Sequence, residues 1–137
     1  MSLLRVLVSW LAILALAFVN GAFRELVLVP ALGYPWALLL SGLVLCACIL
    51  AIAYLALRRR EVRTALQAFG IGASWLALTL VFEFTFGRLV QGKSWNDILG
   101  AYTFARGNLW PVVLLVVLLA PAAIRAIQVA RAANRDA

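Results

Sequence analysis

One acidic residue lies inside an apolar stretch, and it is the strongest candidate for chemistry. Glu83 stands about four residues, or about 6 Å, inside the end of the apolar run 65–87. A bare carboxylate is costly in hydrocarbon, so we expect Glu83 to be paired, protonated or in contact with water. Trp75, Thr79, Glu83 and Gly87 recur at every fourth position and share one helical face. We assign this face to the interior of a bundle.

Polar residues near the end of the first apolar run supply possible partners for Glu83. Asn20 and Arg24 are four residues apart, Glu25 follows directly, and Arg88 lies five residues beyond Glu83. A pair between Arg24 and Glu83 would clamp the first run to the third. Alternatively, the cluster binds or passes an ion, a proton or a lipid headgroup, or it contacts another protein. The candidate cluster comprises Asn20, Arg24, Glu25, Thr79, Glu83 and Arg88.

Several other chemistries are excluded by residue type. The sequence contains no histidine, which removes the commonest general base and the usual ligand of haem and zinc. Cys46 and Cys48 are two positions apart, so on a helix they point about 200° apart and cannot bridge each other. We interpret both as packing residues. We therefore expect no cofactor and no metal site.

The elements that position these residues are membrane-spanning helices. Apolar residues make up 66% of the 137 residues and charged residues only 12%, whereas soluble domains have roughly 45–50% and about 25%. Lipid admits helices or closed barrels, and the alternation of barrel strands is missing. We predict an all-α, four-helix transmembrane bundle forming a single integral-membrane domain, 1–137, with spans at about 3–23, 36–57, 65–87 and 109–128.

The longest connection, 91–107, is predicted to contain a short amphipathic helix. Ser94 and Asp97 match an N-terminal capping pattern. Trp95, Ile98, Leu99 and Tyr102 then follow at helical spacing, so we expect a helix from about 94 to 105 lying in the membrane interface. Asn108 is expected to cap the fourth span. The predicted interface anchors are Trp95, Tyr102 and Trp110.

Prolines and small residues predict breaks and close approaches. Pro30, Gly33 and Pro35 fall between the first two spans and predict a break there. Pro121 is expected to bend the fourth span. Gly70 and Ser74 form a small-x-x-x-small pair that would allow close helix approach, within the bundle or between protomers.

The distribution of positive charge predicts that both termini are cytoplasmic. With that orientation, eight Lys and Arg residues lie inside and four outside. The inner set is expected to rest against anionic lipid headgroups. A net charge of +7 without a soluble domain gives no reason to expect nucleic acid. The inner residues are Arg5, Arg58, Arg59, Arg60, Arg63, Arg125, Arg131 and Arg135, and the outer ones are Arg24, Arg88, Lys93 and Arg106.

The first span also imitates a cleavable signal peptide. Arg5, a short apolar run and the small residues of 15–17 are typical of such a segment. The apolar stretch continues through Phe18 and Val19, however, and cleavage would leave three spans with an awkward charge balance. We expect Met1 to be retained.

Three stretches of the sequence resemble a family of small, uncharacterised four-span proteins of the bacterial inner membrane. They are 20–25, 82–95 and 109–121, in the same order along most of the chain. The resemblance implies a bacterial inner membrane and a four-helix architecture. It implies no activity.

Three classes of function are compatible with these features. The first is an oligomeric transporter or channel that uses the polar cluster at the outer ends of spans 1 and 3. The second is a non-catalytic accessory subunit or assembly factor that binds another membrane protein. A lipid-active enzyme is the least supported, because no nucleophile and base accompany Glu25, Glu83 and Asp97.

Overall fold

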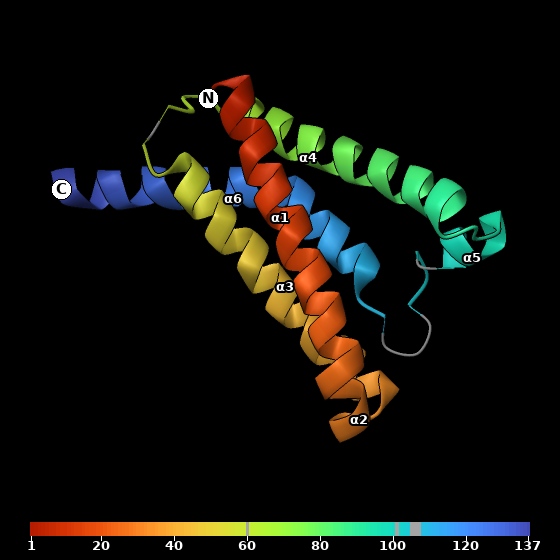
Figure 1. Cartoon of the computed structure of the whole chain (residues 1–137). Helices are drawn as coiled ribbons and strands as arrows, with labels where there is room; N and C mark the ends of the chain where they lie inside the picture. Colours follow the sequence, from red (N-terminus) through yellow and green to blue (C-terminus); the bar gives the residue numbers. More distant parts are fainter. Residues whose placement is uncertain (60, 101, 105–107) are drawn as a thin grey trace.

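The fold is all-α, as the sequence predicts: four long helices pack as a bundle, and a short helix lies between the third and fourth (Figure 1). The computed structural model describes residues 1–59, 61–100, 102–104 and 108–137. Arg60 and Arg106, which entered the charge count, lie outside the described residues. So does part of the helix predicted over 94–105.

Within the described residues, four helical segments are long and apolar enough to cross a membrane. The first is longer than predicted, because α1 (Leu3–Phe23) continues through a π-helical segment, η1 (Arg24–Leu28), into α2 (Val29–Leu32). The fourth also runs past the predicted end. The remaining segments are α3 (Tyr34–Leu57), α4 (Ala65–Thr85) with a second π-helical segment η2 (Phe86–Val90), α5 (Trp95–Gly100) and α6 (Trp110–Asp136).

The break between the first two spans lies at a glycine rather than at the first proline. Pro30 lies within the continuous helical segment Leu3–Leu32, directly after the π-helical segment η1, and does not end the helix. Gly33 ends the helix with φ of 79°, a left-handed conformation that glycine adopts without steric cost. The sequence prediction is therefore correct for Gly33 and wrong for Pro30.

α4 packs closely against α6 at Gly72. A Cβ atom there would overlap the backbone carbonyl group of Leu118. The predicted pair is not used within the bundle: Gly70 is exposed with open space around its Cα, and the Ser74 hydroxyl donates to the Gly70 carbonyl oxygen at 2.8 Å. Gly70 and Gly72 are two positions apart and thus face opposite sides of α4.

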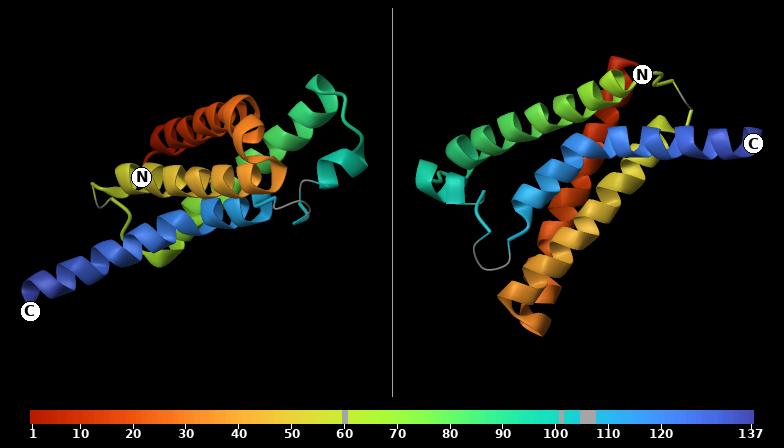
Figure 2. Two further views of the ribbon diagram at one scale, coloured as in Figure 1. Left: turned by 90° about the horizontal axis from the view of Figure 1, so that it is seen from below. Right: turned by 180° about the vertical axis from the view of Figure 1, so that it is seen from behind.

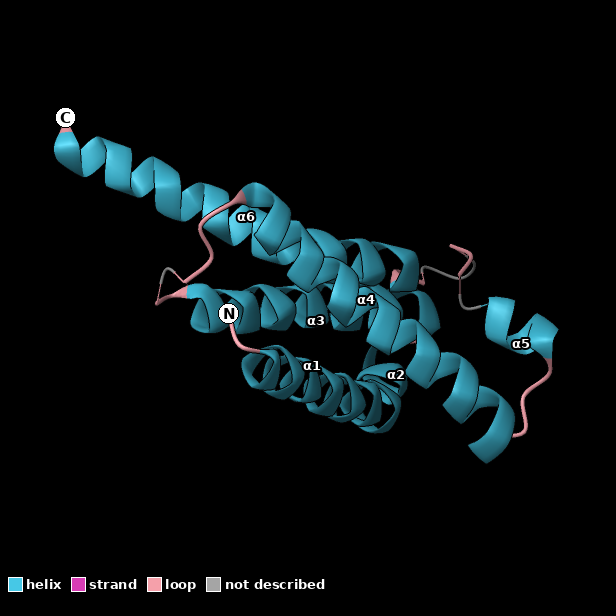
Figure 3. Ribbon diagram, turned by 90° about the horizontal axis from the view of Figure 1, so that it is seen from above, coloured by secondary structure: helices cyan, strands magenta, loops and turns pink. Residues whose placement is uncertain are grey.

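The four long helices converge at one end of the bundle and spread at the other. Figures 1 and 2 show both termini and the α3–α4 connection at one end, which we call the terminal end. The α2–α3 turn and α5 lie at the other end, called the α5 end. α1 and α3 run side by side, whereas α4 diverges from α1 toward the α5 end (Figures 1 and 3). α6 changes direction part-way along its length, as expected of a helix containing Pro121.

Candidate functional site

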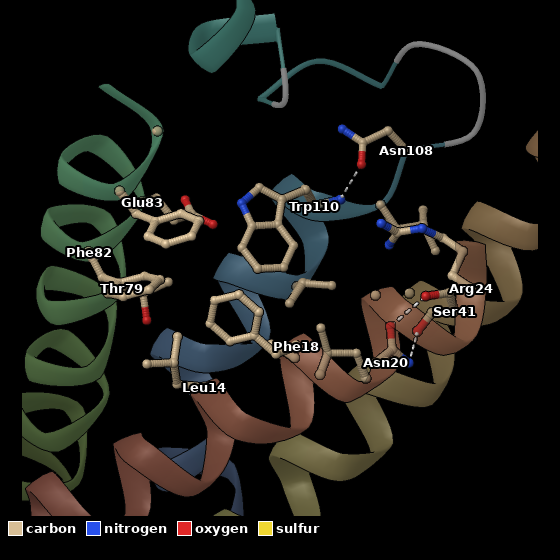
Figure 4. A pocket seen from close by; sticks show the side chains of 18 of the residues that line it. Leu14, Phe18, Asn20, Arg24, Ser41, Thr79, Phe82, Glu83, Asn108 and Trp110 are labelled. Atoms are coloured by element: carbon tan, nitrogen blue, oxygen red, sulfur yellow. Dashed lines mark hydrogen bonds between the residues drawn. The ribbon is translucent and has the colours of Figure 1, made fainter. Parts of the chain in front are cut away.

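The divergence of α4 from α1 leaves a cavity of about 630 Å³ at the α5 end. Residues of α1, α3, α4 and α6 line it, together with the connection around α5 (Figure 4). Its volume lies within the roughly 300–1,000 Å³ of small-molecule sites. Apolar side chains such as Leu14, Leu45 and Val113 line its deeper part, and polar side chains line its α5 end.

A hydrogen-bonded layer closes the cavity toward the terminal end. The Trp10 indole donates to the Thr79 hydroxyl oxygen at 3.1 Å, and that hydroxyl donates to the Trp75 carbonyl oxygen at 2.8 Å. The fully buried Trp75 indole donates to the Val6 carbonyl oxygen at 3.1 Å. These bonds join α1 to α4 where the helices are close. Thr79 is therefore buried at the cavity floor, on the interior face predicted from its spacing.

The α4 wall of the cavity carries Glu83, half-buried and held by neutral donors. The Tyr102 hydroxyl donates to Glu83 Oε2 at 2.6 Å. The indole nitrogen of Trp110 points toward the same carboxylate (Figure 4). Burial, and then the hydrogen bond that it donates to Glu83, raise the pKa of Tyr102, so the phenol stays neutral and remains a donor.

The α1 and α3 wall is held together by its own polar contacts. Asn20 Nδ2 donates to the Ser41 carbonyl oxygen at 3.1 Å, and the Ser41 hydroxyl donates to Asn20 Oδ1. Arg24 Nε lies 3.1 Å from Glu25 Oε1, and the Tyr34 hydroxyl donates to Glu25 Oε2 at 3.2 Å. Arg24 is thus neutralised by its neighbour in sequence.

The predicted clamp between Arg24 and Glu83 is wrong. Figure 4 shows these two side chains on different walls of the cavity. In the described part of the chain, the ion pairs are Arg5 with Glu61 and Arg24 with Glu25. The physical reason is the spread of the helices, which separates the end of α1 from the end of α4.

Arg88 does not pair with Glu83 either. It is exposed, its Nη1 donates to the Lys93 carbonyl oxygen at 3.0 Å, and its guanidinium lies 5.0 Å from the centre of the Trp95 ring. This cation–π contact holds the start of α5 to the end of α4. The structure therefore groups Asn20, Arg24, Glu25, Thr79 and Glu83 around one cavity and leaves Arg88 outside it.

The predicted helix after span 3 exists but is shorter in the described residues, from Trp95 to Gly100. Its cap is confirmed, because Ser94 Oγ accepts from the Asp97 amide at 3.2 Å. Ile98 is buried against Gly87. Phe84 contacts the rings of Trp95 and Tyr102, with centroids 6.0 and 5.9 Å apart. These contacts hold the α5 segment against α4 and place the Tyr102 hydroxyl next to Glu83.

The start of α6 presents Trp110 to the cavity. Asn108 Oδ1 accepts from the Trp110 amide at 3.1 Å, but the N-cap of α6 is Leu109, which makes no side-chain capping bond, so the prediction of Asn108 as the cap is wrong by one residue. Pro111 follows in the first turn, as expected.

Two features of the site were not identified from the sequence. One is an aromatic bridge between α1 and α4: Phe18 contacts Phe82 and Phe86, each with ring centroids 5.9 Å apart, and Phe82 also meets Trp10 at 6.4 Å. The spacing of Phe82 and Phe86, four residues apart, is its signal in the sequence. The other is the pair of π-helical segments, which begin at Arg24 and Phe86, beside the cavity. Such segments are frequent at functional sites.

No family model matches the chain, and neither a curated protein nor a solved structure matches it. The four long apolar helices decide its class. The chain is a small polytopic membrane protein. The family resemblance, the inner membrane and the roles of the site residues remain predictions.

Proposed function

We propose that this protein is a transporter whose cavity at the α5 end binds a small organic cation with an apolar body. The observation that carries the proposal is the environment of Glu83. Its carboxylate faces the cavity, it is held by the neutral hydroxyl of Tyr102, and no ion pair with it is found in the described part of the chain. A half-buried carboxylate outside any ion pair, on which Lys93 acts only through its charge, is a site for a cation or a proton.

The other charged residues that line the cavity support this choice of charge. Among the described residues they are Arg24 and Lys93 against Glu25, Glu83 and Asp97, an excess of one negative charge. Because Arg24 is paired with Glu25, the charge nearest the apolar part of the cavity is that of Glu83.

Aromatic side chains favour an organic cation over a hydrated metal ion. Phe18, Phe82 and Trp110 line the cavity near Glu83 (Figure 4). Aromatic faces attract a desolvated ammonium or phosphonium group, and the apolar deeper wall accommodates its hydrocarbon substituents. A metal ion would need further oxygen ligands.

The closed floor favours a transporter over a channel. The layer of Trp10, Thr79 and Trp75 separates the cavity from the terminal end, so passage requires α1 and α4 to rearrange. As predicted from the sequence, we propose that the protein works as a homo-oligomer in the bacterial inner membrane, with both termini in the cytoplasm. The exposed Gly70 and Ser74 face of α4 is available to a second copy.

The test is flux of a fluorescent lipophilic cation, ethidium, into proteoliposomes under a pH gradient. The wild type and Glu61→Gln are expected to move ethidium, because Glu61 lies at the terminal end and pairs with Arg5. Glu83→Gln, the same chemical change at the cavity, is expected to abolish the flux while folding normally. Equal flux in the wild type and Glu83→Gln would refute the proposal.

Purification in mild detergent tests the alternative of an accessory subunit. A defined homo-oligomer is the result expected of the transporter. Recovery of a different membrane protein in fixed stoichiometry, together with no ethidium flux, would favour the accessory subunit instead.

A further inference from the structure

We infer a second binding site, for an anionic phospholipid, in a groove between α1 and α3 at the terminal end. The groove has a volume of about 270 Å³ and lies where the two helices run side by side (Figures 1 and 3). It shares no lining residue with the cavity that contains Glu83. The inference therefore stands independently of the proposed transport activity.

Three arginines line one end of the groove. Arg5 comes from the first turn of α1, and Arg58 and Arg59 directly follow α3. Arg5 is paired with Glu61, whereas Arg58 and Arg59 have no ion pair in the part of the chain that the structure describes. The groove therefore presents two guanidinium groups that are not engaged in ion pairs, although the charge of Arg59 acts on Glu61. Guanidinium groups bind phosphate through several hydrogen bonds at once.

The rest of the groove is apolar and lies deeper in the spans. Ala12 lies seven residues after Arg5 in α1, and Ile52 lies six residues before Arg58, in α3. At 1.5 Å per residue, this places them about 10 Å from the arginines. An anionic head at the helix ends with an acyl chain along the helices matches this order of charged and apolar surface.

Ser9 adds a polar group to the wall of the groove. Ser9 is mostly buried, but its hydroxyl oxygen keeps some exposure and makes no hydrogen bond in the described chain. The hydroxyl can therefore take a hydrogen-bonding partner from the groove. A glycerol or phosphate oxygen of a lipid seated in the groove would supply one. Basic pockets between membrane helices bind anionic headgroups in this manner.

The test uses purified protein in non-ionic detergent, with lipid adducts resolved by native mass spectrometry. Phosphatidylglycerol is expected to bind in preference to phosphatidylcholine of the same chain length. Arg58→Gln with Arg59→Gln is expected to weaken phosphatidylglycerol binding about thirtyfold, from about 1 kcal/mol for each arginine. The matched control, Arg131→Gln with Arg135→Gln, removes the same charge from the end of α6 and is expected to bind as the wild type does.

A second pair of variants tests the apolar part without changing charge. Ala12→Phe fills the groove and is expected to weaken binding, whereas Ala15→Phe, on an exposed face of the same helix and outside the groove, is not. Equal binding of phosphatidylcholine would overturn the inference, as would equal losses in both arginine pairs. Saturation by inorganic phosphate alone would show an anion site without a lipid and would also overturn it.

Discussion

Replacing Glu83 by glutamine separates a role in binding from a role in stability. Glutamine keeps the length of the side chain and a carbonyl oxygen that accepts from the Tyr102 hydroxyl, which lies 2.6 Å from Glu83 Oε2. A hydrogen bond to a charged group contributes about 1.5–3 kcal/mol, and one between neutral groups about 0.5–1.5 kcal/mol. We therefore expect Glu83→Gln to lower the free energy of unfolding by only about 1 kcal/mol.

An ion pair would give a different result. Breaking a buried pair costs about 3–5 kcal/mol, because it leaves an uncompensated charge. The structure instead pairs Arg24 with Glu25 on another wall. Adding Arg24→Gln to Glu83→Gln should thus recover no stability, and the effects of the two substitutions should add.

The assay is unfolding in detergent by denaturant, followed by circular dichroism, for the wild type, the two single variants and the double variant. Tyr102→Phe serves as a control, since it removes the hydroxyl but keeps the ring stacked on Phe84. If Glu83→Gln lowers the free energy of unfolding by more than about 3 kcal/mol, and Arg24→Gln partly restores it, this reasoning is refuted. Such a result would support an ion pair between Arg24 and Glu83.

Three further predictions concern other parts of the bundle. Gly72→Ala should destabilise the protein by about 1–3 kcal/mol or more, because the Cβ of the new alanine meets the Leu118 carbonyl group. Gly70→Ala should not destabilise it, because there is open space at that position. Thermal melting of both variants checks this, and equal melting temperatures would contradict the prediction. Tyr102 should ionise at a higher pH than a free tyrosine, so the hydrogen bond of its neutral hydroxyl to Glu83 persists until the pH passes the raised pKa of Tyr102. The difference in tyrosinate absorbance between the wild type and Tyr102→Phe measures this ionisation. Ionisation of Tyr102 at the pH of a free tyrosine would count against the prediction. The hydrogen bond and charge of Arg5 lower the pKa of Glu61, so this pair should stabilise the fold at neutral pH and cease to do so as the pH falls through that lowered pKa. The melting temperatures of the wild type and Glu61→Gln should therefore converge in acid. A difference between them that grows in acid would contradict the prediction.

Hydropathy predicted the spans well because burial in lipid acts on each helix separately. The apolar runs located the four long helices, and local capping patterns located α5 through Ser94 and Asp97. The first span was predicted to end at about residue 23, whereas the helix continues through the π-helical segment η1 and through Pro30 to Leu32.

The partner of Glu83 could not be predicted, since it depends on how two helices cross. The spacing of Thr79 and Glu83 gave the correct interior face of α4. The spacing of residues does not show that α4 diverges from α1. This divergence places Arg24 too far from Glu83 to pair with it and leaves room for Tyr102. Gly70 and Gly72 illustrate the same limit, because a pair of small residues does not specify which face of a helix meets its neighbour.

Equilibrium binding of a lipophilic cation tests the central claim most directly. Isothermal titration calorimetry of tetraphenylphosphonium into the purified protein, from about pH 4 to about pH 8, gives affinity and proton release together, and this range begins near the ordinary glutamate pKa of about 4.3. The account predicts binding at one site, with protons released as the cation displaces them from Glu83 and with affinity falling in acid. Glu83→Gln should bind weakly and without pH dependence, whereas Glu61→Gln should behave as the wild type. Undiminished, pH-dependent binding by Glu83→Gln, or no binding by the wild type at any pH, would contradict the account.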